Sequence, residues 1–340
     1  MKKAERAIIS VWKKEGIGKF AKELKEFDIE ILSTGGTAKT IRDAGVEVTE
    51  ISDYTKSPEL LGGRVKTLHP QIHAGILAIR DNDTHLKDME RHGIKPIDIV
   101  VVNFYPFEDV IKNEGVALSE AIENIDIGGP TLLRAAAKNY KYITIVTYPE
   151  DYKTVIEELK RNKGYVSPEK NLHLAQKAFS YVSRYDAAIS NYLTSLEDGK
   201  RTKFPESLTI YFEKKMKLRY GENPHQEGAF YIQPGLEEPC VSNATQLQGK
   251  ELSLNNIFDT DAALEAVKEF SETACVIVKH NNPCGVAAAE SPREAFLKAR
   301  ECDPESAFGG IVAFNTEVDE TTASELSAMF LEVVVAPSYS

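Results

Sequence analysis

The stretch that decides the fold class reads Ile97-Asp98-Ile99-Val100-Val101-Val102-Asn103-Phe104-Tyr105-Pro106. Its first six residues form a near-continuous apolar run, which is typical of a central parallel strand covered on both faces. Asn103 and Tyr105 follow at the carboxyl end of this strand, where open α/β sheets bind their ligands. Tyr105 is equally consistent with an aromatic side chain that packs under a loop.

The segments around this stretch alternate between strand and helix patterns. Apolar runs at 7–11, 29–32 and 142–146 predict buried strands, and 46–51 alternates in polarity like a strand. Helical spacing separates the first two of these strands, where Phe20, Leu24 and Phe27 recur every three or four residues. Strands that alternate with helices predict a parallel α/β sheet, and we assign it to residues 1–147.

A helical connection is expected next, over residues 148–199. Its longest helix, near 172–193, carries apolar side chains that we interpret as core and not as a cofactor-binding face: Ala175, Phe179, Val182, Tyr185, Ile189 and Tyr192. The polar segment 197–203 then leads into a second domain, which we assign to residues 200–340.

Two glycine-containing turns of the first domain have the character of anion-binding loops. Ser33-Thr34-Gly35-Gly36-Thr37 joins a strand to a helix, so that free backbone N–H groups and the positive helix terminus face a ligand. It lacks a Walker lysine and does not match G-x-G-x-x-G, which disfavours a nucleoside triphosphate and a dinucleotide. The alternative is a tight turn in which the glycines only satisfy backbone geometry.

The second turn is Gly62-Gly63-Arg64-Val65-Lys66-Thr67-Leu68-His69-Pro70. It gathers two cations, a hydroxyl and an imidazole between paired glycines, which allow close approach to a ligand, and a proline that fixes the exit of the chain. The alternative is a solvated basic turn, as most loops with Arg and Lys are.

Asp126-Ile127-Gly128-Gly129-Pro130 opens a helix that carries Arg134 and Lys138, four residues apart on one face. Such a pair usually lies on a solvated face. Because the surrounding residues are small or apolar, we expect this helix to be buried, and a buried cation needs a partner, which an anionic ligand would supply.

In the second half, a strand at 274–278 delivers Lys279-His280-Asn281-Asn282-Pro283-Cys284-Gly285. A lone histidine is more often structural, but Lys-His at the end of an apolar strand suggests adjacent acid and base groups. Pro-Cys also occurs in zinc deaminases, whose pattern requires H-x-E and a second cysteine. Position 287 is alanine and no H-x-E lies nearby, so we expect no metal.

Composition excludes several classes of protein. The 340 residues are 42% hydrophobic and 27% charged, as in ordinary globular proteins. A net charge of −11 argues against nucleic-acid binding, which usually needs a basic surface. No apolar run reaches membrane-spanning length, and the four cysteines form no C-x-x-C pair, so we expect a cytoplasmic protein with reduced thiols.

The motifs resemble the bifunctional purine-biosynthesis enzymes that join IMP cyclohydrolase to aminoimidazole-carboxamide-ribonucleotide (AICAR) formyltransferase. In the first half the similar segments are S-T-G-G-T (33–37), G-R-V-K-T-L-H-P (63–70), N-F-Y-P-F (103–107) and D-I-G-G-P-T-L-L-R-A-A-A-K-N (126–139). In the second half they are L-R-Y-G-E-N-P-H-Q (218–226), V-K-H-N-N-P-C-G (278–285) and S-A-F-G-G (306–310).

The resemblance implies a methylglyoxal-synthase-like α/β domain with a parallel sheet, followed by part of a deaminase-like α/β formyltransferase domain. Family members continue well beyond position 340, so we expect impaired formyl transfer. The implied reaction of the first domain is the dehydration of formyl-AICAR to IMP, without a cofactor. The implied formyl donor of the second domain is 10-formyltetrahydrofolate as co-substrate, and the implied assembly is a homodimer.

The resemblance also implies roles for individual residues. Catalysis in the first domain would use Lys66, Tyr105, Asp126 and Lys138. Its substrate-binding residues would be Ser10, Lys14, Ser33, Thr34, Gly35, Gly36, Thr37, Arg64, Thr67 and Asn103. Formyl transfer would use Lys279 and His280, with substrate contacts from Arg219, Tyr220, Asn256, Gly309 and Glu332.

One position departs from the family pattern. The family reads S-V-S-D-K where this chain has Ser10-Val11-Trp12-Lys13-Lys14, and an indole cannot accept a hydrogen bond as a serine hydroxyl does. Two other functions share the fold of the first domain: a methylglyoxal-synthase-type lyase and a regulatory nucleotide-binding module. The segments 66–69 and 126–129, and the whole second half, argue against both.

Overall fold

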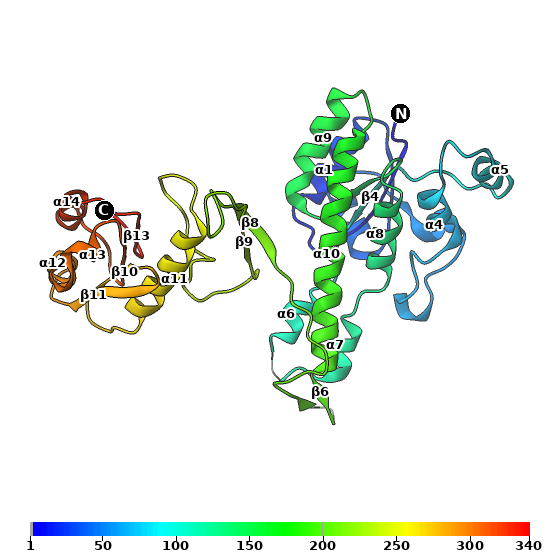
Figure 1. Ribbon diagram of the computed structural model, residues 1–340. Helices are drawn as coiled ribbons and strands as arrows, with labels where there is room; N and C mark the ends of the chain where they lie inside the picture. Colours follow the sequence, from blue (N-terminus) through cyan, green and yellow to red (C-terminus); the bar gives the residue numbers. More distant parts are fainter. Residues whose placement is uncertain (1–2, 114, 199) are drawn as a thin grey trace. The chain divides into compact units, whose positions relative to one another are not determined.

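The computed structural model describes residues 3–113, 115–198 and 200–340, and the chain divides into two compact units (Figure 1). The first unit ends at Ile210 and the second covers Tyr211–Ser340. The segment expected as a helical connection at 148–199 therefore belongs to the first unit. Its long helix packs on that unit's own sheet and helices, which explains why the boundary lies after it.

The first unit is built on a parallel sheet with the strand order β3-β2-β1-β4-β5. These strands are β1 (Arg6–Ser10), β2 (Glu30–Ser33), β3 (Thr49–Glu50), β4 (Ile99–Val102) and β5 (Thr144–Val146). All four residues of β4 are buried, as its unbroken apolar run predicts. The α/β class with a parallel sheet is confirmed.

Helices connect these strands along the chain, and most of them are labelled in Figure 1. They are α1 (Ile17–Lys25), α2 (Gly35–Asp43), α3 (Ile51–Thr55), η1 (Leu61–Gly63), α4 (Pro70–Leu77), α5 (Asp83–Arg91), α6 (Phe107–Ile111), α7 (Leu118–Glu123), α8 (Gly128–Lys138), η2 (Pro149–Asp151), α9 (Tyr152–Arg161) and α10 (Pro168–Thr194). A short hairpin of β6 (Leu196–Glu197) and β7 (Lys200–Arg201) follows.

The helical spacing seen in the sequence matches burial at most positions. Helix α1 buries Phe20 and Leu24 against the sheet. Along α10, Val182 and Tyr185 lie in the same core, but Phe179 is 41% exposed. The prediction that Phe179 is a core residue is therefore wrong, because its ring lines a surface hollow beside Arg134.

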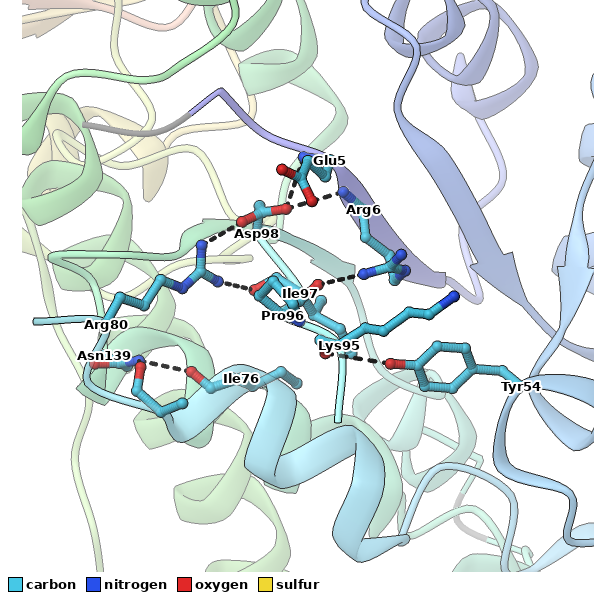
Figure 2. Close-up of polar contacts among 11 residues, drawn as sticks. Glu5, Arg6, Tyr54, Ile76, Arg80, Lys95, Pro96, Ile97, Asp98 and Asn139 are labelled. Atoms are coloured by element: carbon cyan, nitrogen blue, oxygen red, sulfur yellow. Dashed lines mark hydrogen bonds and ion pairs between the residues drawn. The ribbon is translucent and has the colours of Figure 1, made fainter. Parts of the chain in front are cut away.

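A network of buried charges holds the amino-terminal edge of the sheet (Figure 2). Asp98, just before β4, accepts hydrogen bonds from the backbone N–H groups of Glu5 (2.7 Å) and Arg6 (2.9 Å) and pairs with Arg80. The Arg80 guanidinium also donates to the Ile97 carbonyl at 2.6 Å. Since Asp98 is 7% exposed, this network fastens β1 to β4 in a site that excludes water.

The second unit contains a four-stranded sheet with the order β11-β10-β12-β13. Its elements are β8 (Glu213–Lys217), β9 (Ala229–Ile232), α11 (Leu254–Lys268), β10 (Ala274–Lys279), β11 (Asn282–Ala288), α12 (Pro292–Cys302), α13 (Pro304–Ala307), β12 (Ile311–Phe314), α14 (Glu320–Ser327) and β13 (Val333–Val335). Alternate residues of β10 face opposite helices: Val276 packs with α11, whereas Ile277 packs with α12.

Candidate active site

A cavity of about 790 Å³ lies at the carboxyl edge of the first sheet. Its wall consists of the loops after β1, β2 and β4, the loop before α4 and the segment between α7 and α8. Strand β1 has β2 as its neighbour on one side and β4 on the other side, so the strand order reverses at β1. Open α/β sheets bind ligands in the crevice at such a switch point.

Asn103 joins the loops on the two sides of the switch point. Its side-chain oxygen accepts from the backbone N–H groups of Trp12 (2.6 Å) and Lys13 (2.9 Å), and its amide nitrogen donates to the Lys13 carbonyl (3.2 Å). The residue is 6% exposed. Asn103 lines the cavity as predicted, but its hydrogen-bonding atoms are engaged in shaping the loop after β1.

The first turn of α2 forms a cationic cradle. Thr34 precedes this helix and makes no capping hydrogen bond to it, so the first backbone N–H groups keep their donors for another partner. A Cβ placed on Gly35 would lie 3.7 Å from Lys66 Nζ, and one on Gly36 would lie 3.4 Å from Lys14 Cε. Two lysines thus lie over a helix N-terminus, an arrangement that suits an anion.

Two hydroxyls predicted to bind the same anion are used inside the protein. Ser33 is fully buried, is absent from the cavity wall, and donates to the Ile9 carbonyl at 2.7 Å. Thr37 lines the cavity, but its hydroxyl donates to the Val11 carbonyl (2.9 Å) and accepts from the Val11 N–H (3.1 Å). These two side chains fasten β1 to β2 and α2.

The loop before α4 carries its two cations to the cavity in an unusual backbone conformation. Leu61, Gly62 and Gly63 all have positive φ angles, of 54°, 64° and 92°. A Cβ on Gly63 would lie 2.7 Å from Lys66 Cε, so glycine lets the lysine fold back over the loop. Arg64, on the cavity wall, forms an ion pair with Glu123 at the end of α7.

Asp126 lies half-buried on the cavity wall before α8. Burial raises the pKa of its carboxyl group, and backbone N–H donors from Gly129 (2.8 Å) and Tyr105 oppose that shift. A Cβ on Gly129 would lie 2.8 Å from Asp126 Oδ2, and one on Gly128 would lie 3.0 Å from Thr67 Oγ1. The paired glycines are therefore needed for the close approach of the carboxylate and the Thr67 hydroxyl.

Tyr105 and Trp12 meet at the cavity wall. The Tyr105 ring is 43% exposed and lies edge-on to the indole, with ring centroids 5.1 Å apart and planes at 81°. Lys14 Nζ lies 5.6 Å from the centroid of the indole ring and donates to the Trp12 carbonyl at 3.2 Å. Trp12 thus replaces a serine hydroxyl with an aromatic surface that contacts both neighbours.

Two tyrosines of α10 support the cavity, and their role was not predicted. Tyr181 accepts a hydrogen bond from the Phe104 N–H (3.2 Å), and Tyr185 accepts one from the Asp126 N–H (2.7 Å). The pair lies one helical turn apart on α10, and both rings pack on Phe104 in the loop after β4. Their four-residue spacing was the available signal, but it is shared by ordinary core aromatics.

Lys138 does not share this cavity. Helix α8 begins at the cavity with Gly128, and ten residues of helix advance the chain by about 15 Å. Lys138 instead lines a separate hollow of about 580 Å³ between α4, α8 and α10, with Arg134 and Phe179. Of the four predicted catalytic residues of the first domain, one chain therefore brings together Lys66, Tyr105 and Asp126.

In the second unit, four predicted residues meet at one edge of the sheet. Lys279 ends β10 and donates to the Phe308 carbonyl at 2.7 Å, one residue before Gly309. The Glu332 N–H donates to the Gly310 carbonyl at 3.1 Å, at the start of the neighbouring strands. His280, with a positive φ of 55°, follows Lys279 directly.

Asp259 of α11 holds the turn that carries His280. Its carboxylate accepts from the backbone N–H groups of His280 (3.2 Å) and Asn281 (2.7 Å), both of which have positive φ. Asn256, one turn earlier, is 9% exposed and forms a capping box with Ser253. Its side-chain oxygen is therefore used to start the helix, although a substrate contact was expected.

The remaining two predicted residues lie beside the start of α11. The Arg219 N–H donates to the Leu252 carbonyl (2.9 Å), and the Tyr220 carbonyl accepts from the Leu254 N–H (3.3 Å). The Arg219 guanidinium stacks over the Tyr220 ring at 4.9 Å from its centroid. Both side chains therefore stand at the helix end that also carries Asn256.

Residues 3–113, 115–198 and 200–340 contain no group of three or more His, Cys, Asp or Glu side chains arranged to hold a metal ion. Within the same ranges, no helix combines the length and the apolar character that a membrane span requires. The four cysteines are all unpaired thiols.

Comparisons with known proteins match both halves of the chain. A family model described as "AICARFT/IMPCHase bienzyme" matches residues 136–340, and one described as "MGS-like domain" matches residues 16–131. A solved structure titled "Crystal structure of ForH" is 37% identical, with a TM-score of 0.48. That match covers 55% of this chain and 96% of the other. The two family models follow each other in the order that the motifs predict.

Proposed function

The chain belongs to the AICARFT/IMPCHase bienzyme family, and from this premise we propose that its first unit closes the purine ring of formyl-AICAR to give IMP. The carboxamide nitrogen attacks the formyl carbon, a C–N bond forms, and the formyl oxygen leaves as water. The observation that supports this proposal most strongly is the convergence of Lys66, Tyr105 and Asp126 on one cavity with a cationic cradle at its side.

We assign the phosphate of the ribonucleotide to this cradle. Thr34, Gly35 and Gly36 offer a helix N-terminus, and Lys14 offers a cation. Ser10 and Arg64 also line the cavity, and Thr67 presents its hydroxyl next to Gly128. Ser33, Thr37 and Asn103 support the proposal indirectly, because they hold the loops in place.

The chemistry requires proton transfer and charge stabilisation. The attacking nitrogen loses a proton, and the formyl oxygen must gain protons before it leaves. A carboxyl group whose pKa is raised by burial exchanges protons closer to neutral pH, which fits Asp126. The Tyr105 phenol and the Lys66 ammonium are donors on the same wall and suit the negative charge that develops on the formyl oxygen.

The decisive test is a spectroscopic ring-closure assay with formyl-AICAR. We expect turnover by the chain, a loss of about 100-fold for Asp126→Asn or Lys66→Met, and no methylglyoxal from dihydroxyacetone phosphate. Binding of purine ribonucleotides without any turnover would instead favour the regulatory module, and methylglyoxal production would favour the lyase.

The proposed role of Lys138 in ring closure requires a second copy of the chain. The family resemblance assigns it to ring closure, yet within one chain it lines a different hollow. We therefore propose a homodimer in which the Lys138 of one copy completes the cavity of the other. Mixing Lys66→Ala and Lys138→Ala chains would then restore roughly a quarter of wild-type activity, since half of the dimers are mixed and each has one intact site. No recovery would contradict this arrangement.

For the second unit we propose a part in formyl transfer from 10-formyltetrahydrofolate to AICAR, in the cytoplasm. His280 would take the proton from the AICAR amine, and Lys279 would stabilise the formyl oxygen, with Gly309 and Glu332 at the same edge. Arg219, Tyr220 and Asn256 lie at the start of α11 and would contact the nucleotide. An assay with the two substrates tests this: turnover by the chain that His280→Ala leaves unchanged would contradict it.

A further inference from the structure

One carboxylate lies directly in the cationic cradle. Glu59 accepts a hydrogen bond from the Thr34 hydroxyl at 2.5 Å through one oxygen, and its other oxygen lies 3.2 Å from Lys66 Nζ. Thr34 and Lys66 both line the cavity, and both belong to the group that faces the first turn of α2. Glu59 thus binds the groups that an anionic ligand needs.

We propose that Glu59 is an internal competitor for the phosphate of the ribonucleotide, which must displace this carboxylate from Thr34, and so free Lys66 for ring closure, in order to bind. The inference rests on the proposed function of the cavity and adds a residue that sets its affinity and selectivity. A carboxylate and a phosphate accept the same kinds of hydrogen bond from a hydroxyl and an ammonium group. Only one of them can accept the hydrogen bond of the Thr34 hydroxyl at a time.

The charges of the two competitors give the site its selectivity. A phosphate monoester carries nearly two negative charges at pH 7, whereas Glu59 carries one. A ligand with a phosphate therefore gains enough from Lys14 and the helix terminus to displace the carboxylate. A nucleoside without a phosphate leaves Glu59 in place, so the cavity discriminates against it.

The position of Glu59 allows its carboxylate to move away from Thr34 and Lys66. Its side chain is 40% exposed, and it lies just before a loop closed by a short bridge between Leu60 and Val65. The Thr34 hydroxyl, followed by Lys66, holds the pKa of Glu59 below its usual range, against the effect of burial. The competitor is therefore ionised at neutral pH.

A different role would give a different result. If Glu59 served to position Lys66 for catalysis, its removal would lower kcat and leave phosphate affinity unchanged or weaker. If Glu59 competes with phosphate, its removal strengthens phosphate binding. The direction in which phosphate affinity changes therefore distinguishes competition from positioning.

The test compares the full chain with Glu59→Gln, which removes the charge, and with Glu59→Ala, which also removes the hydrogen-bond acceptor. Glu15→Gln is the control, because Glu15 is exposed one residue after Lys14 and its substitution changes the net charge equally. Binding of IMP, inosine and inorganic phosphate is followed by calorimetry and by the fluorescence of Trp12, the only tryptophan of the chain.

We expect Glu59→Gln to bind IMP and inorganic phosphate about fivefold more tightly than the wild type, as suits the loss of a partly exposed ion pair and one hydrogen bond. Inosine should bind to Glu59→Gln and to the wild type with equal affinity. The affinity of Glu15→Gln for IMP and inorganic phosphate should stay within about twofold of the wild-type value. Glu59→Ala should bind phosphate at least as tightly as Glu59→Gln.

Unchanged or weaker phosphate binding by both Glu59 variants overturns the inference. Failure of the proposed function looks different: the wild type would then not convert formyl-AICAR, while the titration with inorganic phosphate would still compare Glu59 with its variants.

Discussion

The charged residues at the two edges of the first sheet differ in how deeply they and their partners are buried. At the amino-terminal edge, Asp98 is 7% exposed, and it is satisfied by two backbone N–H groups and by Arg80 (Figure 2). At the carboxyl edge, Lys66 and Arg64 are paired with carboxylates that are 40% and 57% exposed. The same strands therefore end in a closed network on one side and in loosely held cations on the other.

This difference separates stability from function within one sheet. Buried charges that are paired cannot be removed singly without a large loss of stability. Partly exposed ion pairs contribute little to stability, so a ligand can replace them at low cost. We expect substitutions at the amino edge to affect folding, and substitutions at the carboxyl edge to affect binding and rate.

The largest effect is expected for Asp98→Ala. The change leaves Arg80 buried without its carboxylate and two backbone N–H groups without an acceptor, which should lower the free energy of unfolding by about 3–5 kcal/mol. Urea unfolding followed by Trp12 fluorescence measures this in the first unit. Asp109→Ala is the control, because its ion pair with Lys112 is exposed and should contribute at most about 0.5 kcal/mol. Equal losses in the two variants would contradict the comparison.

At the carboxyl edge, Asp126→Asn should mainly affect the rate of ring closure and not the stability of the fold. It should slow ring closure about 100-fold, equivalent to ~2.7 kcal/mol, without a matching loss of stability. The folded protein holds the Asp126 proton more tightly than the unfolded chain, because burial raises the pKa above its ordinary value of 3.8. Wild-type stability therefore falls as the pH rises from that ordinary value through the raised one.

The asparagine variant lacks this titration. Its free energy of unfolding should rise relative to the wild type across the same pH window, and then stay constant above it. Paired urea titrations between pH 4 and pH 8 measure the difference. A relative stability of Asp126→Asn that falls with increasing pH would mean that Asp126 is stabilised as a carboxylate, against our interpretation.

A smaller effect on both properties is expected for Tyr185→Phe. The change removes the acceptor of the Asp126 N–H and the donor to the Asn124 carbonyl, at a cost of about 1–2 kcal/mol in stability. Ring closure should fall several-fold because the Asp126 loop loses its support. Tyr192→Phe on the same helix, where the ring packs on Phe107, is the control and should leave the rate unchanged.

The smallest effect is expected for Glu123→Gln. Its ion pair with Arg64 joins two partly exposed side chains at the cavity, so the free energy of unfolding should change by less than about 0.5 kcal/mol. A loss comparable to that of Asp98→Ala would show that the carboxyl edge also carries stability. Thermal unfolding of the two variants side by side measures this.

The sequence predicted those features that depend on local pattern. The apolar run at 99–102 is buried along its whole length, and the polar residues after it reach a cavity at the switch point. Gly128 and Gly129 stand where a Cβ would touch Thr67 and Asp126. In each of these places the backbone conformation or the strand order follows from a few adjacent residues.

Features that depend on distant partners were not predictable. The hydroxyls of Ser33 and Thr37 are taken by carbonyls of the first strand and the loop after it, which no local pattern reveals. The position of Lys138 depends on how α8 packs against α10, and the spacing alone could not assign it to a cavity. The supporting role of Tyr185 likewise requires its contact with the Asp126 loop.

The Asp98 network also has a consequence for how the protein is made. Its carboxylate lies 93 positions after Glu5, whose N–H group it accepts, and β4 is the inner neighbour of β1. At ordinary elongation rates the ribosome adds that much chain in about 5–20 s. During this interval β1 has β2 as its neighbour but an open apolar edge on its other side. Residues 99–102 must therefore leave the ribosome before this edge of β1 is covered.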